Sequence, residues 1–253
     1  MIPWIESHTI AIGPLHIQTW GTLVALGFLV ATWVASIRAK KYGIKSSDVW
    51  DYAVWAFLSA FVGARLFHVL FYDPSWYLAH PLDAINPTLP GFSMMGGVIG
   101  AVVAAVIFVK YKKIDLLKLA DACMYALPLG IGIGRIGCFL IHDHPGTLTH
   151  FILGVKYPDG ATRHDLGLDL SILGFFIFVL FYFLGRKNHK PGFFLGLWLV
   201  IDGSTRFCLD FFRLVDVRYY GLTPTQWLLF VTVGIGVWIL FNNQRLTTYN
   251  SQE

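Results

Sequence analysis

One segment of the chain combines side chains that could bind and activate a charged ligand. Arg135 lies in the otherwise uncharged run Ala122–Ile141, and His142, Asp143 and His144 follow it directly. A guanidinium at membrane depth costs free energy, and such residues usually face a cavity, a partner or a ligand. The planar fork of arginine also suits the geometry of phosphate. The segment therefore predicts one wall of a site for an anionic lipid headgroup, opening at a membrane face.

Further charged side chains occur in two other apolar segments. Asp202, Arg206 and Asp210 are spaced four apart, so they would form one stripe on a helix. Such a stripe indicates either a functional site or an internal ion pair that holds two helices. Arg65 lies in the apolar stretch FVGARLFH, where it would either bind substrate or extend its charge to lipid headgroups.

The histidines allow a metal site as an alternative. His142 and His144 could both ligate a metal if their segment is extended, together with His68, His150 or His164. No helical motif of the HExxH type supports this interpretation. We therefore predict neither a metal ion nor a cofactor.

Composition places the chain among integral membrane proteins. Of its 253 residues, 56% are hydrophobic and 13% are charged, and the mean hydropathy is +0.61. Soluble domains carry about 25% charged residues. The net charge of +4 comes from basic residues in loops rather than on one face, so we expect no nucleic-acid partner. The literal GxGxxG match at Gly132–Gly137 lies within an apolar span, which excludes a dinucleotide-binding site.

We predict an all-α polytopic membrane protein of about seven transmembrane helices, forming a single domain over residues 1–253. A span needs about 20 apolar residues. The candidates are Trp20–Ile37, Val49–Tyr72, Phe92–Val109, Leu116–Ile141, Leu168–Leu184, Phe193–Phe211 and Thr223–Phe241. The third and sixth are short or interrupted by polar residues.

Basic residues give the expected orientation, because cytoplasmic loops are enriched in Lys and Arg. Twelve of the nineteen lie after the first, third, fifth and seventh spans, and the segment Asp73–Gly91 has none. We therefore expect the N-terminus outside and the C-terminus in the cytoplasm. The segment 142–167 should form a small outer cap, with a hairpin around Asp159-Gly160.

Several motifs together resemble prolipoprotein diacylglyceryl transferase. They are GPLHIQTWG, VGARLFHVLFY, MMGGVIG, GIGRIGCF with Gly146, and RFCLDFFR followed by LTPTQW. Their order and spacing match the family from about Ala11 to Leu240. The resemblance implies a bacterial inner-membrane enzyme that transfers the diacylglyceryl group of phosphatidylglycerol to the thiol of a lipobox cysteine in a prolipoprotein.

The resemblance also implies which residues form the site. We expect Arg135 and Arg206 to stabilise phosphate. The other substrate-binding candidates are Arg65, Gly96, Gly97, Gly137, Gly146 and Asp202. Met95, Cys138 and Trp20 stand where the family has His, Asn and Tyr, and Asp210 replaces its Glu.

These replacements leave the proton acceptor unassigned, because the thioether of Met95 takes no proton. His142, Asp143 and His144 are the candidate catalytic substitutes, alongside Arg135, Arg206 and Asp210. Two alternatives remain. One is a non-catalytic lipid-binding or assembly protein that kept the fold. The other is a metal-dependent lipid hydrolase.

Overall fold

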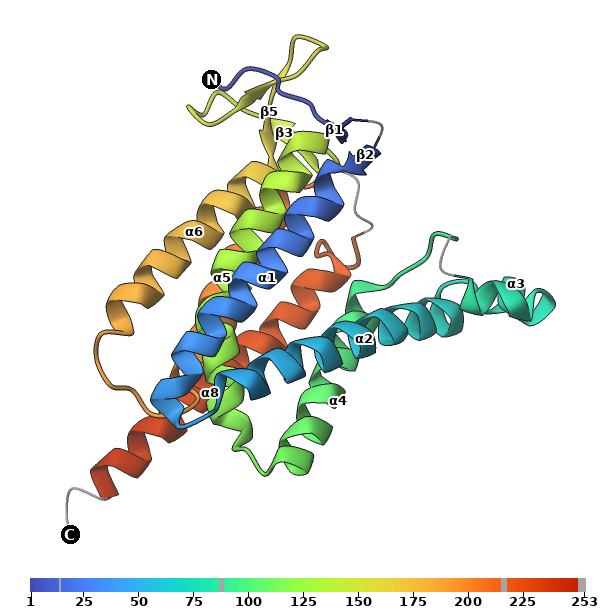
Figure 1. The fold of residues 1–253 in the computed structure, drawn as a ribbon. Coiled ribbons are helices and arrows are strands. Elements are labelled where there is room, and N and C mark those ends of the chain that lie inside the picture. Colours follow the sequence, from blue (N-terminus) through green and yellow to red (C-terminus); the bar gives the residue numbers. More distant parts are fainter. Residues whose placement is uncertain (14, 87–88, 215–217, 250–253) are drawn as a thin grey trace. The chain divides into compact units, whose positions relative to one another are not determined.

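The computed structural model describes residues 1–13, 15–86, 89–214 and 218–249, and within them it confirms an all-α polytopic architecture (Figure 1). Six of the described helices are long and apolar enough to cross a membrane. They are α1 (Thr19–Ala39), α2 (Ser46–Phe71), α4 (Met94–Lys112), α5 (Leu116–Ile141), α6 (Leu166–Leu184) and α8 (Pro224–Tyr249). Each overlaps a predicted span.

The sixth predicted span, Phe193–Phe211, corresponds to α7 (Phe193–Leu209), which has only 17 residues. It is shorter than the roughly 20 residues that a perpendicular crossing needs. This length, rather than the Asp202 and Arg206 of its last turns, separates it from the six longer apolar helices. The expected count of about seven therefore includes one helix that is both short and polar at its end.

The contacts of the chain divide it into two compact units. The first comprises Met1–Arg38 and Ala120–Glu253, and the second comprises Ala39–Leu119. The prediction of one domain is not decided by this division and stays a prediction.

In the first unit, α1, α5 and α6 run side by side (Figure 1), and glycines allow their close approach. A Cβ built at Gly27 of α1 would lie 2.5 Å from the carbonyl oxygen of Gly130 on α5. On the other side of α5, Ser171 of α6 donates a hydrogen bond to the Gly132 carbonyl at 2.8 Å. Within the apparent GxGxxG motif, a Cβ at Gly132 would lie 3.3 Å from the Phe175 ring of α6, and one at Gly137 would lie 3.0 Å from the Trp20 Cα of α1. These two glycines serve helix packing, as expected for small residues between membrane helices.

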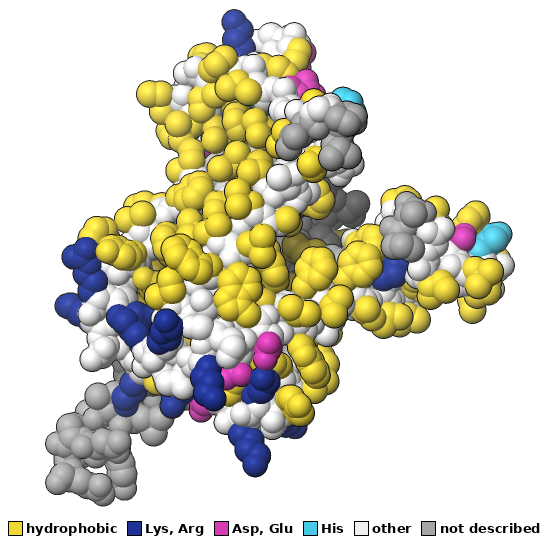
Figure 2. All heavy atoms as spheres, in the orientation of Figure 1, with side chains coloured by type: hydrophobic (Ala, Val, Ile, Leu, Met, Phe, Trp, Pro, Cys, Tyr) yellow, Lys and Arg dark blue, Asp and Glu magenta, His cyan; other side chains and the backbone are white. Residues whose placement is uncertain are grey.

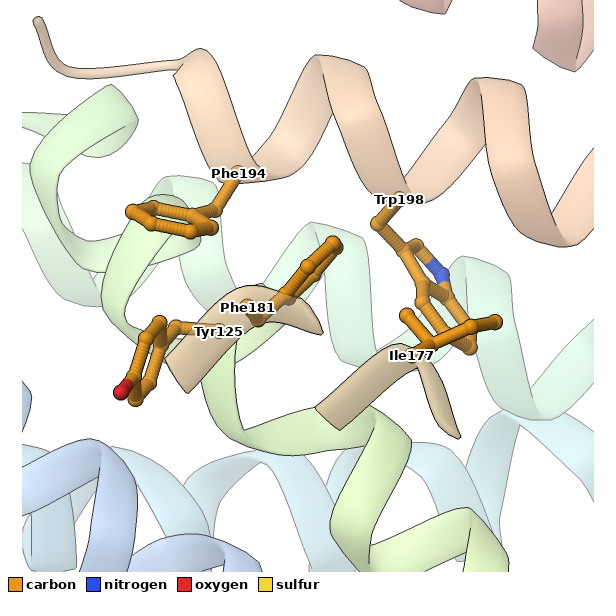
Figure 3. Close-up of a cluster of buried hydrophobic side chains, with 5 residues drawn as sticks. All are labelled: Tyr125, Ile177, Phe181, Phe194 and Trp198. Atoms are coloured by element: carbon orange, nitrogen blue, oxygen red, sulfur yellow. The ribbon is translucent and has the colours of Figure 1, made fainter. Parts of the chain in front are cut away.

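An aromatic cluster joins α5, α6 and α7. Figure 3 shows Tyr125 of α5, Ile177 and Phe181 of α6, and Phe194 and Trp198 of α7 packed together. The Phe181 and Phe194 rings lie 5.3 Å apart at an interplanar angle of 62°, which is a favourable edge-to-face geometry. This cluster holds α7 against the two longer helices.

The segment 142–167, predicted to form a cap, contains a three-stranded sheet in the order β3-β5-β4, formed by β3 (Pro145–Leu148), β4 (Val155–Lys156) and β5 (Thr162–Asp165). Antiparallel pairing of β4 with β5 confirms the predicted hairpin, and Gly160 in its turn has a φ of +81°. A left-handed backbone favours glycine there.

The N-terminal segment adds an unpredicted hairpin, β1 (Thr9–Ile12) paired antiparallel with β2 (Leu15–Gln18). Before it, the chain runs along the cap, where the Ile2 amide donates to the Gly154 carbonyl at 2.9 Å. Together these contacts attach the N-terminus to the cap.

In the second unit, α2 and α4 pack through Gly63, Gly96 and Gly100. Between them, the segment Asp73–Gly91 forms the short helix α3 (Pro74–Ala79) and a 3-10 turn, Pro81–Ile85. Arg65 of α2 donates to the carbonyls of Asp83, Ala84, Asn86, Leu89, Pro90 and Gly91. Its guanidinium therefore anchors this segment to α2.

Hydrophobic side chains cover much of the visible surface of the long helices (Figure 2). On α2, for example, Val54, Phe57 and Leu58 are each more than half exposed. An apolar surface of this extent is unfavourable in water and is expected where helices face lipid.

Candidate active site

Arg135 is the least engaged of the predicted phosphate ligands. It lies on α5, half-buried, and its Nη1 approaches the Cys138 Sγ at 3.7 Å. A thiol is a weak acceptor, so this contact satisfies little of the hydrogen-bonding capacity of a guanidinium. Among the described residues, no carboxylate pairs with it. Arg135 therefore retains donors for an anion.

Arg206 is partly neutralised on its own helix. Its Nε lies 3.3 Å from Asp202 Oδ2, and its Nη2 donates to Asp202 Oδ1 at 3.4 Å. The stripe predicted from the spacing thus forms an i,i+4 pair, and it lies within α7 rather than between two helices. Both side chains are 18% exposed, so the pair is accessible to a ligand.

Asp210 is buried at the end of α7, in the 3-10 turn Asp210–Phe212 (η3). It accepts a hydrogen bond from the Thr223 hydroxyl at 2.6 Å and pairs with Arg213 Nε at 3.4 Å. Thr223 and Gln226 in turn cap α8 reciprocally, each amide N–H donating to the other side chain. Asp210 thus connects the end of α7 to the start of α8.

His142 occupies a closed site rather than the open one expected of a base. Its Nδ1 lies 2.6 Å from Asp165 Oδ2 and its Nε2 lies 3.0 Å from the Ile5 carbonyl oxygen. The ring of Trp4 stacks on it at 3.6 Å. Only 2% of the side chain is exposed. With both nitrogens engaged and buried, His142 lacks a free position for a substrate proton.

Asp165 organises this closed cluster. One of its carboxylate oxygens accepts from Tyr157 Oη at 3.0 Å as well as facing His142, and the other accepts the Leu168 amide as the N-cap of α6. Burial, with the neighbouring Asp165 carboxylate, raises the pKa of the Tyr157 hydroxyl. The cluster therefore fixes the cap to the first turn of α6.

Asp143 and His144 are more accessible than His142. Asp143 is exposed and His144 half-buried, with His144 Nδ1 2.9 Å from Asp143 Oδ1. The two are adjacent in sequence, and their contact lacks the alignment of a hydrogen bond. Of the three predicted substitutes for the missing base, these two remain open to a ligand.

Three of the four predicted substrate-binding glycines lie at close packing contacts. A Cβ at Gly96 would overlap the Gly63 carbonyl and Phe67, one at Gly137 would lie 3.0 Å from the Trp20 Cα, and one at Gly146 would lie 2.9 Å from the His164 carbonyl oxygen. Gly97 differs, because its nearest neighbour would be 3.5 Å away. It alone has room beside it.

The histidines weighed for a metal site are dispersed among separate partners. His142 faces Asp165, His144 faces Asp143, and His164 faces Asp169. Within the described residues, no group of three His, Cys, Asp or Glu side chains is arranged to hold a metal ion.

Comparison with known proteins decides the family. The chain matches the family described as prolipoprotein diacylglyceryl transferase over residues 7–242. The chain belongs to the prolipoprotein diacylglyceryl transferase family.

Individual members of the family resemble it along most of their length. The proteins named phosphatidylglycerol–prolipoprotein diacylglyceryl transferase of Pseudoalteromonas atlantica and Geobacter sulfurreducens are each 31% identical to it. These matches cover 87% and 85% of the chain, and 79% and 85% of the relatives. The protein of the same name from Nitrosomonas europaea is 29% identical over 94% of the chain and 90% of the relative.

Two polar residues of this diacylglyceryl-transferase family member were missed by the sequence analysis. Asp165 is the N-cap of α6, and Asp169 lies in its first turn. Asp169 lies inside an otherwise apolar span, where an ionisable residue signals function or a specific partner. Asp165 stands three residues before Leu168, the predicted start of the helix, in the position of an N-cap. Both signals were present in the sequence.

Proposed function

We propose that the chain transfers the diacylglyceryl group of phosphatidylglycerol to the cysteine thiol of a prolipoprotein. The observation that carries this proposal is family membership over residues 7–242, together with a half-buried Arg135 that has no carboxylate partner among the described residues. Its relatives are named for this reaction. A helical membrane protein with a free guanidinium at membrane depth suits a phospholipid substrate.

The reaction needs a thiolate and a leaving group that is stabilised. A cysteine thiol has a pKa of about 8.5, so a base must take its proton at neutral pH. The thiolate sulfur then attacks the glyceryl carbon that carries the phosphate. The carbon–oxygen bond breaks, and glycerol 1-phosphate leaves with the electron pair.

Cationic groups lower the barrier where this negative charge develops. Arg135 would bind the phosphate directly, because its donors are not committed to a carboxylate. Arg206 would assist while sharing Asp202, which moderates its charge. Gly97, the one predicted glycine with room beside it, is the candidate for close approach of lipid.

The candidate proton acceptors predicted after Arg135 are His142, Asp143 and His144, of which Asp143 and His144 are accessible. A neutral imidazole suits general-base work near pH 7. His142 is a weaker candidate, because both of its nitrogens are already engaged.

We further propose that the site faces the outer side of the bacterial inner membrane. The support is the distribution of Lys and Arg, twelve of nineteen lying in alternate loops. This places the N-terminus and the cap outside and the C-terminus in the cytoplasm. The acceptor would then be the lipobox peptide of a secreted prolipoprotein.

The experiment is transfer by the purified protein from phosphatidylglycerol to a lipobox peptide. Mass spectrometry should detect the peptide with one added diacylglyceryl group, and glycerol 1-phosphate should appear in equal amount. A peptide with Ser in place of Cys is the matched control and should remain unmodified. A lipid-retaining, folded protein that modifies neither peptide would favour the non-catalytic alternative.

A further inference from the structure

A second histidine–carboxylate pair lies at the start of α6, apart from the closed His142 cluster. His164 Nδ1 is 3.2 Å from Asp169 Oδ2, and the two side chains are 16% and 13% exposed. When Asp169 is an ionised carboxylate it can only accept, so Nδ1 donates to it, and in the neutral imidazole Nε2 then bears the lone pair. Among the described residues, Nε2 has no hydrogen-bond partner. His164 is thus oriented and still free to accept a proton.

The pair stands at an open groove of about 580 Å³ between α6 and α7. Ile172, Leu173 and Phe176 form the α6 wall. Ser204, Thr205, Cys208 and Leu209 form the α7 wall. α6 is long and apolar enough to span a membrane, and His164 lies two residues before its start, so the groove runs along the first turns of a candidate membrane span. A lipid and a lipid-facing peptide can both reach His164 from there.

Rings and backbone hold His164 in place beside the family's own motifs. Phe212 of η3 stacks on the imidazole at 4.7 Å and 23°. Gly146 packs so closely against His164 that a Cβ there would lie 3.0 Å from the His164 Cβ. The backbone of Gly146 also forms an isolated antiparallel β-bridge with Arg213 of the RFCLDFFR motif. Two motifs that carry the family resemblance therefore meet at this histidine.

We propose that His164 takes the proton of the acceptor thiol, and that Asp169 is the positioning residue that holds its ring. This inference rests on the proposed transferase function and names a base where the family's histidine is replaced by Met95. His142 has no free nitrogen, and the His144–Asp143 contact is poorly aligned. Among the described histidines, His164 alone combines an aligned carboxylate, an unpartnered Nε2 and a groove.

The step balances without any further reactant. His164 Nε2 takes the S–H proton, the sulfur forms a bond to the glyceryl carbon, and the carbon–oxygen bond to phosphate breaks. Glycerol 1-phosphate leaves with the electron pair, and the imidazolium then returns its proton to water or to that phosphate. Other titratable groups around the ring are Asp165 on its own strand, Cys208 across the groove, and the Asp210–Arg213 pair beside Phe212.

The test measures thioether formation from phosphatidylglycerol and a lipobox peptide, as a function of pH, for wild type, His164→Gln and Asp169→Asn. At pH 7, His164→Gln should lower kcat by about 10²–10⁴-fold, the usual contribution of a general base, with little change in KM for the lipid. Its residual rate should rise about tenfold per pH unit until the thiol ionises by itself near pH 8.5. Asp169→Asn should lower kcat less than His164→Gln does, and it should also alter the dependence of kcat on pH.

Two further readouts separate a base from a structural role. A selenocysteine acceptor peptide, already ionised at neutral pH, should restore most of the rate of His164→Gln. The exposed His150, changed to Gln, is the matched control and should behave as wild type. If His164→Gln fails to retain lipid or to melt cooperatively, the dependence of kcat on pH in Asp169→Asn tests the base assignment instead.

The contrary outcomes are distinct. A His164→Gln variant with wild-type kcat and pH profile overturns the base assignment and leaves the transferase function standing. A defect carried by His144→Gln in its place, rescued by the selenol peptide, also overturns it. A wild-type protein that forms no thioether overturns the proposed function, and this assignment with it.

Discussion

Three arginines, one each on α2, α5 and α7, differ in what their guanidinium groups already bind. Arg65 donates to six backbone carbonyls, Arg206 pairs with Asp202, and Arg135 contacts only a thiol sulfur among the described residues. A donor that is already hydrogen-bonded within the protein contributes little to the binding of an anion. Availability therefore ranks Arg135 above Arg206 and Arg206 above Arg65 as a ligand for phosphate.

This ranking predicts the effect of Lys substitutions on lipid binding. Arg135→Lys keeps the charge but loses the bidentate fork, so it should weaken phosphatidylglycerol binding by about tenfold, the loss of one charge-assisted hydrogen bond. Arg206→Lys should weaken it less, because Asp202 already occupies part of that fork. Lipid retention by the purified variants measures both. Equal retention in wild type and Arg135→Lys would remove Arg135 from the phosphate site.

The buried His142–Asp165 contact predicts a loss of stability rather than a specific loss of chemistry. His142→Ala leaves Asp165 buried with one partner fewer, which should cost about 3 kcal/mol. Thermal melting measures this, with the exposed His150→Ala as control. A His142→Ala variant that melts as wild type does, yet transfers nothing, would instead support His142 as the base.

Ionisation of Tyr157 should lower the stability of this cluster at high pH. Burial raises the pKa of its hydroxyl, so the folded state favours the protonated form. That stabilisation is fully present below the ordinary tyrosine pKa of about 10 and is lost as the pH rises through the higher folded value. Tyr157→Phe should reduce the fall in melting temperature seen between pH 9 and 11. An unchanged fall would assign the loss of stability at high pH to other groups.

At the scale of elements, neighbouring glycines on α4 make a matched pair. A Cβ at Gly96 would overlap α2, whereas one at Gly97 would meet ordinary contact distances. Gly96→Ala should therefore lower the melting temperature. Gly97→Ala should keep or raise it, since alanine favours a helix by about 1 kcal/mol. The opposite order would show that α2 and α4 do not pack through Gly96.

The same elements show how far sequence patterns reach. Long apolar runs specified six membrane helices, and the Asp159-Gly160 turn specified the cap hairpin, because both signals are local. The β1–β2 hairpin was missed, since the segment has no continuous apolar run and only alternates weakly. The start of α6 was placed two residues late, because the capping role of Asp165 went unrecognised.

The site was predicted less well than the helices, for a physical reason. Spacing places residues on a helix face, but it does not show whether their polar groups are already hydrogen-bonded to another segment. His142 was expected to be open, yet Ile5 and Asp165, 137 and 23 residues away, close it. Likewise, the Arg65 carbonyl partners come from a segment 18 to 26 residues further on.

For the whole molecule, the distribution of basic residues predicts an outer N-terminus and a cytoplasmic C-terminus. A reporter that is active only in the cytoplasm, fused after Glu253, should be active. The same reporter fused before Met1 should be silent. Activity at the N-terminus and silence at the C-terminus would invert the topology and place the cap, with His164, in the cytoplasm.

Which bond of the phospholipid breaks tests the transferase account most directly. Phosphatidylglycerol can carry oxygen-18 in the ester oxygen that joins the diacylglyceryl carbon to phosphorus. Attack by a thiolate on carbon breaks the carbon–oxygen bond, so the label should leave entirely in glycerol 1-phosphate, in equal amount with the thioether peptide. Label retained in free diacylglycerol would mean cleavage at phosphorus, as in a lipid hydrolase, and would contradict the account.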